Sequence, residues 1–388
     1  MSTWFPEPAS TSGIFVRDQA DALIEGGNKV AVFMFKYYSL YSWLKKKLTG
    51  HPLSQWIAGR HIKPLAYNFV NYSFTRFSSN PLQAQKKAFL NFAEKKFADY
   101  INQNGKPDII HHHGVADFCY ITAHLSKCFS IPYVITEHSM FIDKVDHFTV
   151  YETKEERLNT IQQAAVRITV GNFYAKFNEG LFHAPFIVVP NMLSSDFITP
   201  PLPQFPKNTG TFYFLNIGAL SRRKRQDIII QAFAGAFKNN KNVKLIIAGN
   251  GELEAELKKL IASLNMQEQI ELAGYKERNE IIKLHDTTHV EVISSEKESF
   301  SMAAAEALVR GNPVLSTRCG GPEDFINEQN GLLCNVNDVA DMQEKLQTIY
   351  NKYSTYNHAQ IAKDAAERFS EQKIVSILEE VYSRALKK

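Results

Sequence analysis

The feature that most constrains the fold of this 388-residue chain is a regular alternation of short apolar runs with helical patterns. The runs end in Gly, Asn or Pro, as buried strands do in a parallel sheet that helices cover on both faces. They span residues 30–35, 108–112, 133–136, 167–170 and 186–189, and then 212–217, 243–248, 270–272, 290–293, 314–317 and 332–333. The sequence therefore predicts an α/β protein of two doubly wound Rossmann-like domains, which face a cleft at the carboxyl ends of their strands.

Prolines mark the boundary between the two domains. Residues 198–206 hold four prolines in nine positions, which neither a helix nor a strand accommodates. We expect an N-terminal domain at 1–195, a linker at 196–210 and a C-terminal domain at 211–365. Apolar residues at helical spacing between Ile374 and Ala385 predict a last helix at 366–388, which we expect to return to the N-terminal domain.

Charge is spread unevenly along the chain. The net charge is +4, yet residues 26–93 hold ten Lys and Arg and no Asp or Glu, and the same stretch is rich in aromatic residues. Lys45, Lys46 and Lys47 beside these aromatics suit an anionic membrane surface or a lipid diphosphate acceptor. The alternative is an inserted helical pair with a solvated basic face. Nucleic acid is not expected as a partner, because no motif for binding it accompanies the charge.

The compartment follows from what the sequence lacks. Its first residues have no basic and then apolar pattern of a secretory signal, and no run approaches the length of a membrane-spanning helix. Four cysteines without C-x-x-C spacing are too few for a disulfide scaffold. We expect a cytoplasmic protein, either free or peripheral on the inner face of the cell membrane.

Three common ways of binding a nucleotide are absent from the sequence. Gly249-Asn250-Gly251 follows a predicted strand, but Glu254 replaces the third glycine of the dinucleotide fingerprint. No P-loop occurs, and no D-x-D pair is present to hold a diphosphate through a divalent metal. A nicotinamide enzyme, a P-loop enzyme and a metal-dependent sugar transferase are therefore disfavoured.

The strongest signal is the segment from Glu298 to Glu306. Ser299 can cap a helix whose first free N–H groups lie near Ser301 and Met302, and such a terminus binds a diphosphate. Glu298 before this helix and Glu306 inside it can accept hydrogen bonds from hydroxyls on either side of that diphosphate. The alternative is a solvated Glu298 and an ordinary helical Glu306.

This segment resembles the E-x7-E signature of the retaining family-4 (group 1) glycosyltransferases, which have the two-domain GT-B fold. The resemblance extends in order and spacing over nearly the whole chain. Its other motifs are Trp4-Phe5-Pro6, residues 12–17, Ile135–His138, Val189–Asn191, Ile217–Lys224 and Cys319–Glu323. The resemblance implies a hexosyltransferase that uses a nucleotide sugar, which we expect to be UDP-linked, and needs neither metal nor cofactor.

The resemblance also implies roles for single residues. Glu306 would hold the nucleotide ribose, Glu298 the hydroxyls of the transferred sugar, and Arg223 with Lys224 would neutralise the diphosphate and stabilise its departure. Gly13 would bring its backbone close to the diphosphate. The remaining residues expected to contact the donor are Gly218, Gly249, Tyr275, Phe300, Ser301 and Met302.

Histidines supply the other candidates. His138 ends a predicted strand, and we expect it to contact the donor sugar or its phosphate; the alternative is a partly buried histidine at the end of that strand. In His111-His112-His113 only the first and third share a face of a strand, so they alone could chelate together. No further ligands can be named, and we expect His113 to act on the acceptor side or structurally rather than to bind metal.

The sequence departs from the family pattern twice. Ala219 lies where most members have arginine, so we expect Arg223 and Lys224 to neutralise the diphosphate without that arginine. The family's first strand precedes the Trp4-Phe5-Pro6 loop and lies at the centre of its sheet, whereas this sequence begins at Met1. We expect either a start misassigned by a few residues or a first strand reduced to a stub.

Two other functions remain open on the same scaffold. One is a catalytically idle GT-B subunit of an assembly that makes envelope polysaccharide. The other is a sugar phosphorylase or a nucleotide-sugar epimerase. The intact Glu298, Glu306, Arg223 and Lys224 favour a transferase that acts on a glycan or lipid-linked acceptor.

Overall fold

The computed structural model describes residues 13–50, 60–71, 81–115, 118–138, 152–205, 207 and 210–387. The chain divides into two compact units. Unit 1 consists of residues 1–170, 174–192 and 374–388, and unit 2 of residues 171–173 and 193–373. Residues 193–195, which were expected in the N-terminal domain, and the predicted linker from residue 196 onward thus belong to unit 2.

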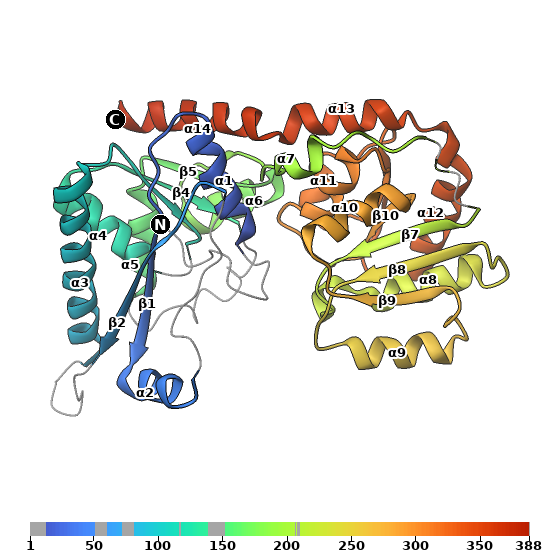
Figure 1. Cartoon of the computed structure of the whole chain (residues 1–388), viewed down its shortest axis with the longest axis horizontal. Helices are drawn as coiled ribbons and strands as arrows, with labels where there is room; N and C mark the ends of the chain where they lie inside the picture. Colours follow the sequence, from blue (N-terminus) through green and yellow to red (C-terminus); the bar gives the residue numbers. More distant parts are fainter. Residues whose placement is uncertain are drawn as a thin grey trace. The chain divides into compact units, whose positions relative to one another are not determined.

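The described residues of unit 1 form two parallel sheets (Figure 1). β1 (Phe33–Ser39) pairs with β2 (Leu65–Asn71), and β3 (Ile110–His113), β4 (Tyr133–Glu137), β5 (Val166–Thr169) and β6 (Ile187–Val188) pair in chain order. Four of the five strands expected here lie within two residues of their predicted bounds. The first was wrong, because β1 begins at Phe33 rather than at residue 30 and extends to Ser39, and β2 was not predicted.

The described helices of unit 1 lie wholly or mostly within its residue ranges. They are α1 (Ile14–Glu25), α2 (Leu40–Leu48), α3 (Pro81–Asn104), α4 (Cys119–Phe129), α5 (Lys154–Gln162), α6 (Asn172–Phe182) and α14 (Glu371–Leu386). α14 carries Ile374, Leu378 and Val381 into a core shared with Leu23 of α1 and Val134 of β4. The C-terminal helix thus returns to the first unit, but it starts at Glu371 rather than at residue 366.

A cavity of about 730 Å³ lies in unit 1, lined among others by Phe33 of β1 and Ile110 of β3. Within the described ranges, each of these two strands is hydrogen-bonded to a neighbouring strand on one side only. The expected first strand and the Trp4-Phe5-Pro6 loop fall on residues 1–12, outside the described residues.

Unit 2 is built on one six-stranded parallel sheet in the order β12-β11-β10-β7-β8-β9 (Figure 1). Its strands are β7 (Phe212–Ile217), β8 (Val243–Ala248), β9 (Ile270–Gly274), β10 (Val290–Ile293), β11 (Val314–Thr317) and β12 (Gly331–Cys334). All six coincide with predicted runs or extend them by one or two residues, because fully buried parallel strands are continuously apolar.

The helices of unit 2 follow its strands in alternation. They are α7 (Ser195–Ile198), α8 (Gln226–Phe237), α9 (Glu254–Ser263), α10 (Arg278–Thr287), α11 (Met302–Val309), α12 (Val339–Lys352) and α13 (His358–Phe369), with 3-10 turns η3 (Arg222–Lys224), η4 (Gly321–Asp324) and η5 (Tyr353–Thr355). Phe214, Phe233 and Leu245 lie in the core between the sheet and α8.

Arg310 explains why the proline-rich segment belongs to unit 2. Its guanidinium is buried and donates to the carbonyls of Phe197, Pro200 and Pro201 at 3.2, 2.9 and 2.8 Å. Asp286 balances its charge at 2.8 Å. Carbonyls in an irregular segment need such donors because no sheet or helix satisfies them.

Candidate functional site

The loops that leave β7, β8 and β9 meet at one edge of the sheet in unit 2. Gly249 has φ 148°, and a Cβ there would lie 2.0 Å from the carbonyl oxygen of Gly218. The amide of Gly249 donates to the carbonyl of Gly274 at 2.9 Å. Only glycine permits the two backbones to approach so closely. The approach brings the predicted residues Gly218, Gly249 and Tyr275 to the ends of neighbouring strands. Tyr275 remains 39% exposed.

An ion pair with a buried carboxylate stands at the same edge of the sheet. Lys224, at the end of η3, donates from Nζ to Oε1 of Glu298 at 2.5 Å, and Ser295 Oγ donates to the same oxygen at 2.6 Å. The aliphatic part of the Lys224 side chain lies beside Gly218, where a Cβ would be 3.5 Å from the lysine Cε. Glu298 is 6% exposed, so the alternative of a solvated carboxylate was wrong.

Arg223 completes the positive side of this pair. Its Nη1 lies 3.8 Å from Oε2 of Glu298 and donates to the carbonyl of Lys297 at 3.1 Å. Burial by itself raises the pKa of Glu298, but the charges of Lys224 and Arg223 outweigh it and hold that pKa below its ordinary value. Glu298 is therefore an ionised acceptor of hydrogen bonds at neutral pH.

The backbone of Glu298 is fixed as firmly as its side chain. Its amide donates to the carbonyl of Cys319 at 2.7 Å, and its carbonyl accepts from Gly321 at 2.8 Å. A Cβ on Gly321 would lie 2.5 Å from the amide nitrogen of Phe300, so glycine is needed for the two loops to approach. This contact between the loops after β10 and β11 sets the path of the chain into α11.

α11 begins later than the sequence predicted. Its N-cap is Ser301, in the left-handed region at φ 77°, and no side chain caps it, so the prediction that Ser299 caps the helix was wrong. The contact of Glu298 with Cys319 and Gly321 keeps residue 299 in the loop. As at the start of every helix, the first backbone amides of α11, from Met302 onward, have no carbonyl partner within the helix.

Two further carboxyls lie near each other in this part of unit 2. Glu306 is half-buried in α11, and Glu291 lies on β10 with no exposed surface. Glu291 accepts from the amide of Ile217 at 3.0 Å. Burial first, and also the charge of Glu306, raise the pKa of Glu291 well above its ordinary value, against the opposing effects of the Ile217 amide and Lys224. Burial therefore favours the protonated form of Glu291.

Sequence reasoning missed Glu291, although a signal was present. It is the one charged residue in the apolar run of residues 290–293. A carboxyl in a buried strand is costly unless it is neutral or paired. Its position beside the end of β7 and its interaction with Glu306 and Lys224 make it part of the site.

Phe300 was predicted to contact the donor, but its ring is in the core. It is 3% exposed and packs against Phe325 and Phe369 with ring centroids 5.4 Å apart in both cases. The ring thus anchors the segment from Glu298 to Ser301 instead of offering a face to a ligand.

The predicted histidines of unit 1 form a buried chain. Asn191 Oδ1 lies 3.2 Å from Nδ1 of His138 and can only accept, so His138 carries its proton there. Nε2 of His138 then accepts from Nδ1 of His113 at 2.9 Å. Burial lowers the pKa of His138 to about 3, against the opposing effect of Asn191, and that of His113 well below its ordinary value. Both rings are neutral.

The neighbouring histidines follow the alternation of a strand. His111 stacks on His113 with ring centroids 4.2 Å apart, and its nitrogens lie 2.8 Å from Tyr382 Oη and 2.7 Å from Thr136 Oγ1. His112 points to the other face, where Nδ1 lies 2.8 Å from Thr122 Oγ1. The nitrogens of His111 and His113 are thus engaged with different partners, rather than directed at one point as metal ligands would be.

Gly13 lies at the N-terminus of α1 with φ 81°, a conformation that glycine adopts without strain. The loop that would lead into it lies outside the described residues. Its predicted approach to a diphosphate stays a prediction.

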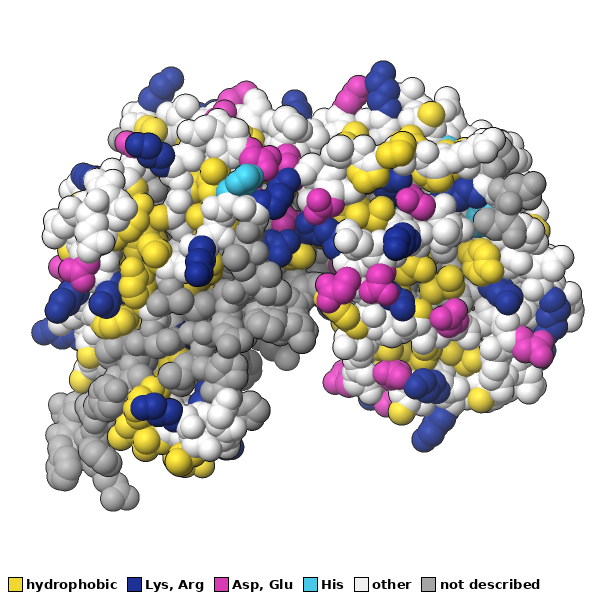
Figure 2. Space-filling view, in the orientation of Figure 1, with side chains coloured by type: hydrophobic (Ala, Val, Ile, Leu, Met, Phe, Trp, Pro, Cys, Tyr) yellow, Lys and Arg dark blue, Asp and Glu magenta, His cyan; other side chains and the backbone are white. Residues whose placement is uncertain are grey.

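Lys45, Lys46 and Lys47 lie in the last turn of α2, none of whose residues is buried. Ser39 caps this helix by accepting from the amide of Ser42 at 3.2 Å. Lys47 Nζ lies over the ring of Trp43, 4.5 Å from its centroid. Figure 2 shows hydrophobic and basic side chains side by side over α2, at the lower left. The exposed apolar residues are Tyr41 at 75%, Leu44 at 43% and Leu48 at 86%.

These apolar residues share one face of α2, because positions separated by three and by seven lie on the same side of a helix. Within the described ranges, no helix combines the length and the apolar character that crossing a bilayer requires.

Comparison with known proteins finds similarity to glycosyltransferases. Residues 202–368 match the family described as glycosyl transferases group 1. An uncharacterised glycosyltransferase of Methanocaldococcus jannaschii is 29% identical over 280 residues, 71% of this chain and 75% of that protein. A phosphatidylinositol N-acetylglucosaminyltransferase component from Arabidopsis thaliana is 22% identical over 284 residues, 73% of this chain and 63% of that protein.

Solved structures agree with the fold. The HepE protein of Anabaena, in complex with UDP and glucose, superposes with a TM-score of 0.67 at 16% identity and covers 99% of both chains. With the two parallel-sheet units, this likeness confirms the predicted GT-B fold.

Proposed function

We propose that this chain is a retaining, metal-independent member of family 4, because residues 202–368 match the group 1 glycosyltransferases, which transfer a sugar from a nucleotide sugar. In this proposal it moves a hexose-type sugar from a UDP-linked donor to a glycan or lipid-linked acceptor of envelope polysaccharide synthesis. The observation that carries the proposal is the pair of Lys224 with the buried Glu298 at the carboxyl edge of the sheet in unit 2.

The cations of unit 2 suit a diphosphate leaving group. Lys224 and Arg223 come from one 3-10 turn and converge on Glu298, and the first amides of α11 follow from Met302. Fixed cations and helix amides stabilise negative charge as the glycosidic bond breaks, and they cost no reorganisation at that moment. In this proposal they take the place of a metal ion.

The two carboxylates of the motif suit the hydroxyls of the donor. Glu298 is held ionised by Lys224 and Arg223, so it would accept hydrogen bonds from the hydroxyls of the transferred sugar. Glu306, farther along α11, would accept from the ribose. A site built to pair with hydroxyls rejects a ligand that lacks them, because its acceptors would stay unpaired.

His138 would act as a neutral group. Its proton on Nδ1 faces Asn191 and its Nε2 faces His113, so a contact with the donor requires it to exchange the His113 bond for a bond to the sugar or phosphate. The family resemblance favours a front-side reaction, in which the departing phosphate takes the proton of the acceptor hydroxyl. Retention of configuration would follow, since the new bond forms on the face that the leaving group vacates.

The choice of UDP and of a membrane acceptor rests on different observations. UDP is present in the HepE structure, and the Arabidopsis relative is named for phosphatidylinositol. In unit 1, the exposed lysines and the apolar face of α2 suit an anionic lipid surface. The enzyme would then work at the cytoplasmic face of the membrane, where its acceptor is carried.

A donor screen tests the proposal. Saturation-transfer NMR of the purified protein with UDP-, GDP- and ADP-sugars should give transfer to the UDP-sugar, with the strongest signals on its ribose and sugar protons. Slow hydrolysis of the bound donor, followed by proton NMR of the released sugar, should show the anomeric configuration retained.

The outcomes separate the alternatives. Absence of binding to every donor would contradict the proposal and favour the catalytically idle protein. Turnover that requires inorganic phosphate would indicate a phosphorylase, and conversion of the donor into its epimer without release of UDP would indicate an epimerase.

A further inference from the structure

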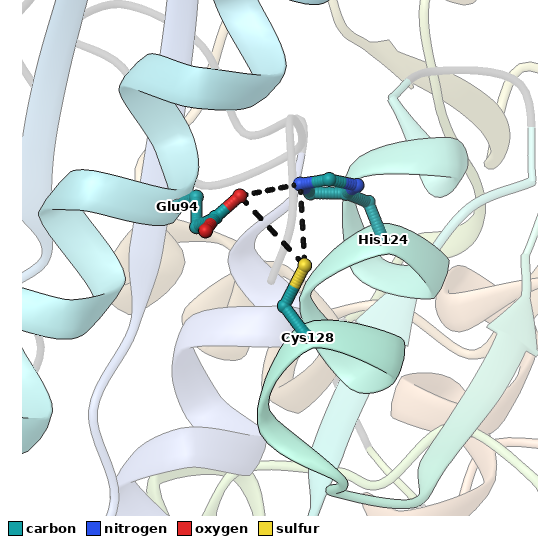
Figure 3. A group of neighbouring side chains, drawn as sticks. All are labelled: Glu94, His124 and Cys128. Carbon is teal, nitrogen blue, oxygen red and sulfur yellow. Dashed lines mark hydrogen bonds and ion pairs between the residues drawn. The ribbon is translucent and has the colours of Figure 1, made fainter.

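A cluster of three metal-ligand types lies in unit 1, and none of its residues was assigned a role above. Glu94 comes from α3, and His124 and Cys128 come from α4 (Figure 3). His124 and Cys128 are four residues apart on one helix, so their side chains lie on the same face. Figure 3 shows the three side chains pointing toward one another from the two helices.

We propose that Glu94, His124 and Cys128 form a binding site for Zn²⁺, with a water molecule as its fourth ligand. Thiolate, imidazole and carboxylate are the ligands that zinc takes in proteins, whereas Mg²⁺ and Ca²⁺ take oxygen ligands. Binding replaces the proton on the sulfur of Cys128 by the metal and releases that proton to solvent.

The distances within the cluster match a tetrahedral site. Bonds of about 2.0 to 2.3 Å place the ligand atoms of tetrahedral zinc roughly 3.3 to 3.6 Å apart. Here Sγ of Cys128 lies 3.5 Å from Nε2 of His124 and 3.7 Å from Oε2 of Glu94. Nε2 of His124 and Oε2 of Glu94 lie 2.9 Å apart, so they need to separate by only a few tenths of an ångström.

The two helices hold the ligands in place without a metal. Phe89 of α3 packs on Phe118 before α4, and Phe97 of α3 packs on Phe129 at its end, with ring centroids 5.3 and 5.2 Å apart. Glu94 lies between the two phenylalanines of α3 in the sequence. Contacts at both ends fix the spacing of the helices. Folding has therefore already ordered the three ligands, so zinc binding costs little further conformational entropy.

Solvent reaches the cluster on its open side. The side chains of Glu94 and His124 are 43% and 28% exposed, and Cys128 is exposed. Three protein ligands with an open position leave room for a water molecule.

A comparable pair elsewhere in unit 1 provides a matched control. His61 and Glu25 lie 2.9 Å apart, as His124 and Glu94 do, and their side chains are 45% and 40% exposed. No sulfur is grouped with that pair in the described part of the chain. If a His–Glu pair alone bound zinc, both places would bind it.

Zinc titration of the untagged full-length protein against a chromophoric chelator tests the site. The wild type should bind one Zn²⁺ tightly, Cys128→Ser and His124→Gln should each weaken that affinity at least about tenfold, and His61→Gln should leave it unchanged. Circular dichroism of each variant would establish that it is folded.

Cobalt distinguishes the proposed ligands from adventitious binding. Co²⁺ added to the wild type should give the intense absorption of a tetrahedral site and a sulfur-to-cobalt charge-transfer band, and Cys128→Ser should lose that band. Equal zinc affinity of wild type and folded Cys128→Ser, or cobalt spectra of an octahedral ion without the sulfur band, would overturn the proposal.

Discussion

The loops of unit 2 and helix α2 of unit 1 both present lysines, but they hold them in opposite ways. Lys224 is partly buried and is fixed by Glu298 at 2.5 Å. Lys45, Lys46 and Lys47 lie on a helix with no buried residue, and none forms a salt bridge with a carboxylate in the described part of the chain. A fixed cation can stabilise one developing charge at one place, whereas exposed cations on a helix surface can only attract a charged surface.

The largest effect should come from the fixed lysine. Lys224→Met removes the cation nearest to Glu298, and we expect kcat to fall by about 10²- to 10³-fold, as when one group that stabilises a transition-state charge is removed. Steady-state kinetics with the donor identified by the screen would measure it.

The control for Lys224→Met is Lys258→Met, because Lys258 makes an equally short ion pair with Glu254 at 2.6 Å on the exposed face of α9. We expect that variant to keep its activity. A similar loss of kcat in both variants, or no loss in either, would show that the fixed position of Lys224 does not contribute to catalysis.

A second test concerns Glu291, the buried carboxyl beside the fixed pair. Glu291→Gln keeps an acceptor for the Ile217 amide and should change the free energy of unfolding by less than about 1 kcal/mol below pH 4.5, where the carboxyl is protonated in both the folded and the unfolded state. Glu291→Ala leaves that amide unpaired and opens a cavity, and should cost about 2 to 4 kcal/mol. Urea unfolding of the three proteins would measure both differences.

The dependence of stability on pH follows from the same carboxyl. Its pKa is raised in the folded protein, so the native state keeps a proton that the unfolded state loses above pH 4.5. Stability should therefore fall as pH rises from 4.5 toward the raised pKa, by up to about 1.4 kcal/mol per pH unit. Glu291→Gln should lack this contribution, and parallel pH profiles of the two proteins would show instead that Glu291 is ionised.

The smallest effect per residue should come from α2. Replacing Lys45, Lys46 and Lys47 by Gln should weaken binding to anionic vesicles by about 1 kcal/mol per lysine and leave transfer to a short soluble acceptor unchanged. Vesicle sedimentation at low and physiological salt would measure it. Unchanged binding to vesicles that contain anionic lipid would contradict the hypothesis that α2 binds the membrane through these lysines.

The sequence was informative where local pattern decides structure. The strands of unit 2 were visible as apolar runs because both faces of each strand are buried. β2 was missed because Tyr67 and its aromatic neighbours were taken for part of a basic segment, whereas its partner β1 makes it a strand. The pairing of Lys224 with Glu298, and not only the presence of each, required tertiary structure.

Two details of the site depended on contacts distant in sequence. Ser299 has the residue type of an N-cap, but the contact of Glu298 with Gly321 holds it in the loop, and α11 starts after Ser301. Phe300 was expected at the ligand because it lies within the motif, yet its ring packs against Phe369 of α13. A motif identifies the segment, and packing decides which of its atoms face a ligand.

The most direct test of the account is isothermal titration of UDP into wild type, Glu306→Ala and Glu296→Ala. Glu296 lies in the loop between β10 and α11 but pairs with Arg225 at the surface, so its loss should leave UDP affinity unchanged. Loss of the hydrogen bonds to the ribose should weaken UDP binding about 100-fold in Glu306→Ala, with its melting temperature preserved. Equal affinity of folded Glu306→Ala and wild type for UDP would contradict the assignment of unit 2 as the donor-binding unit through α11.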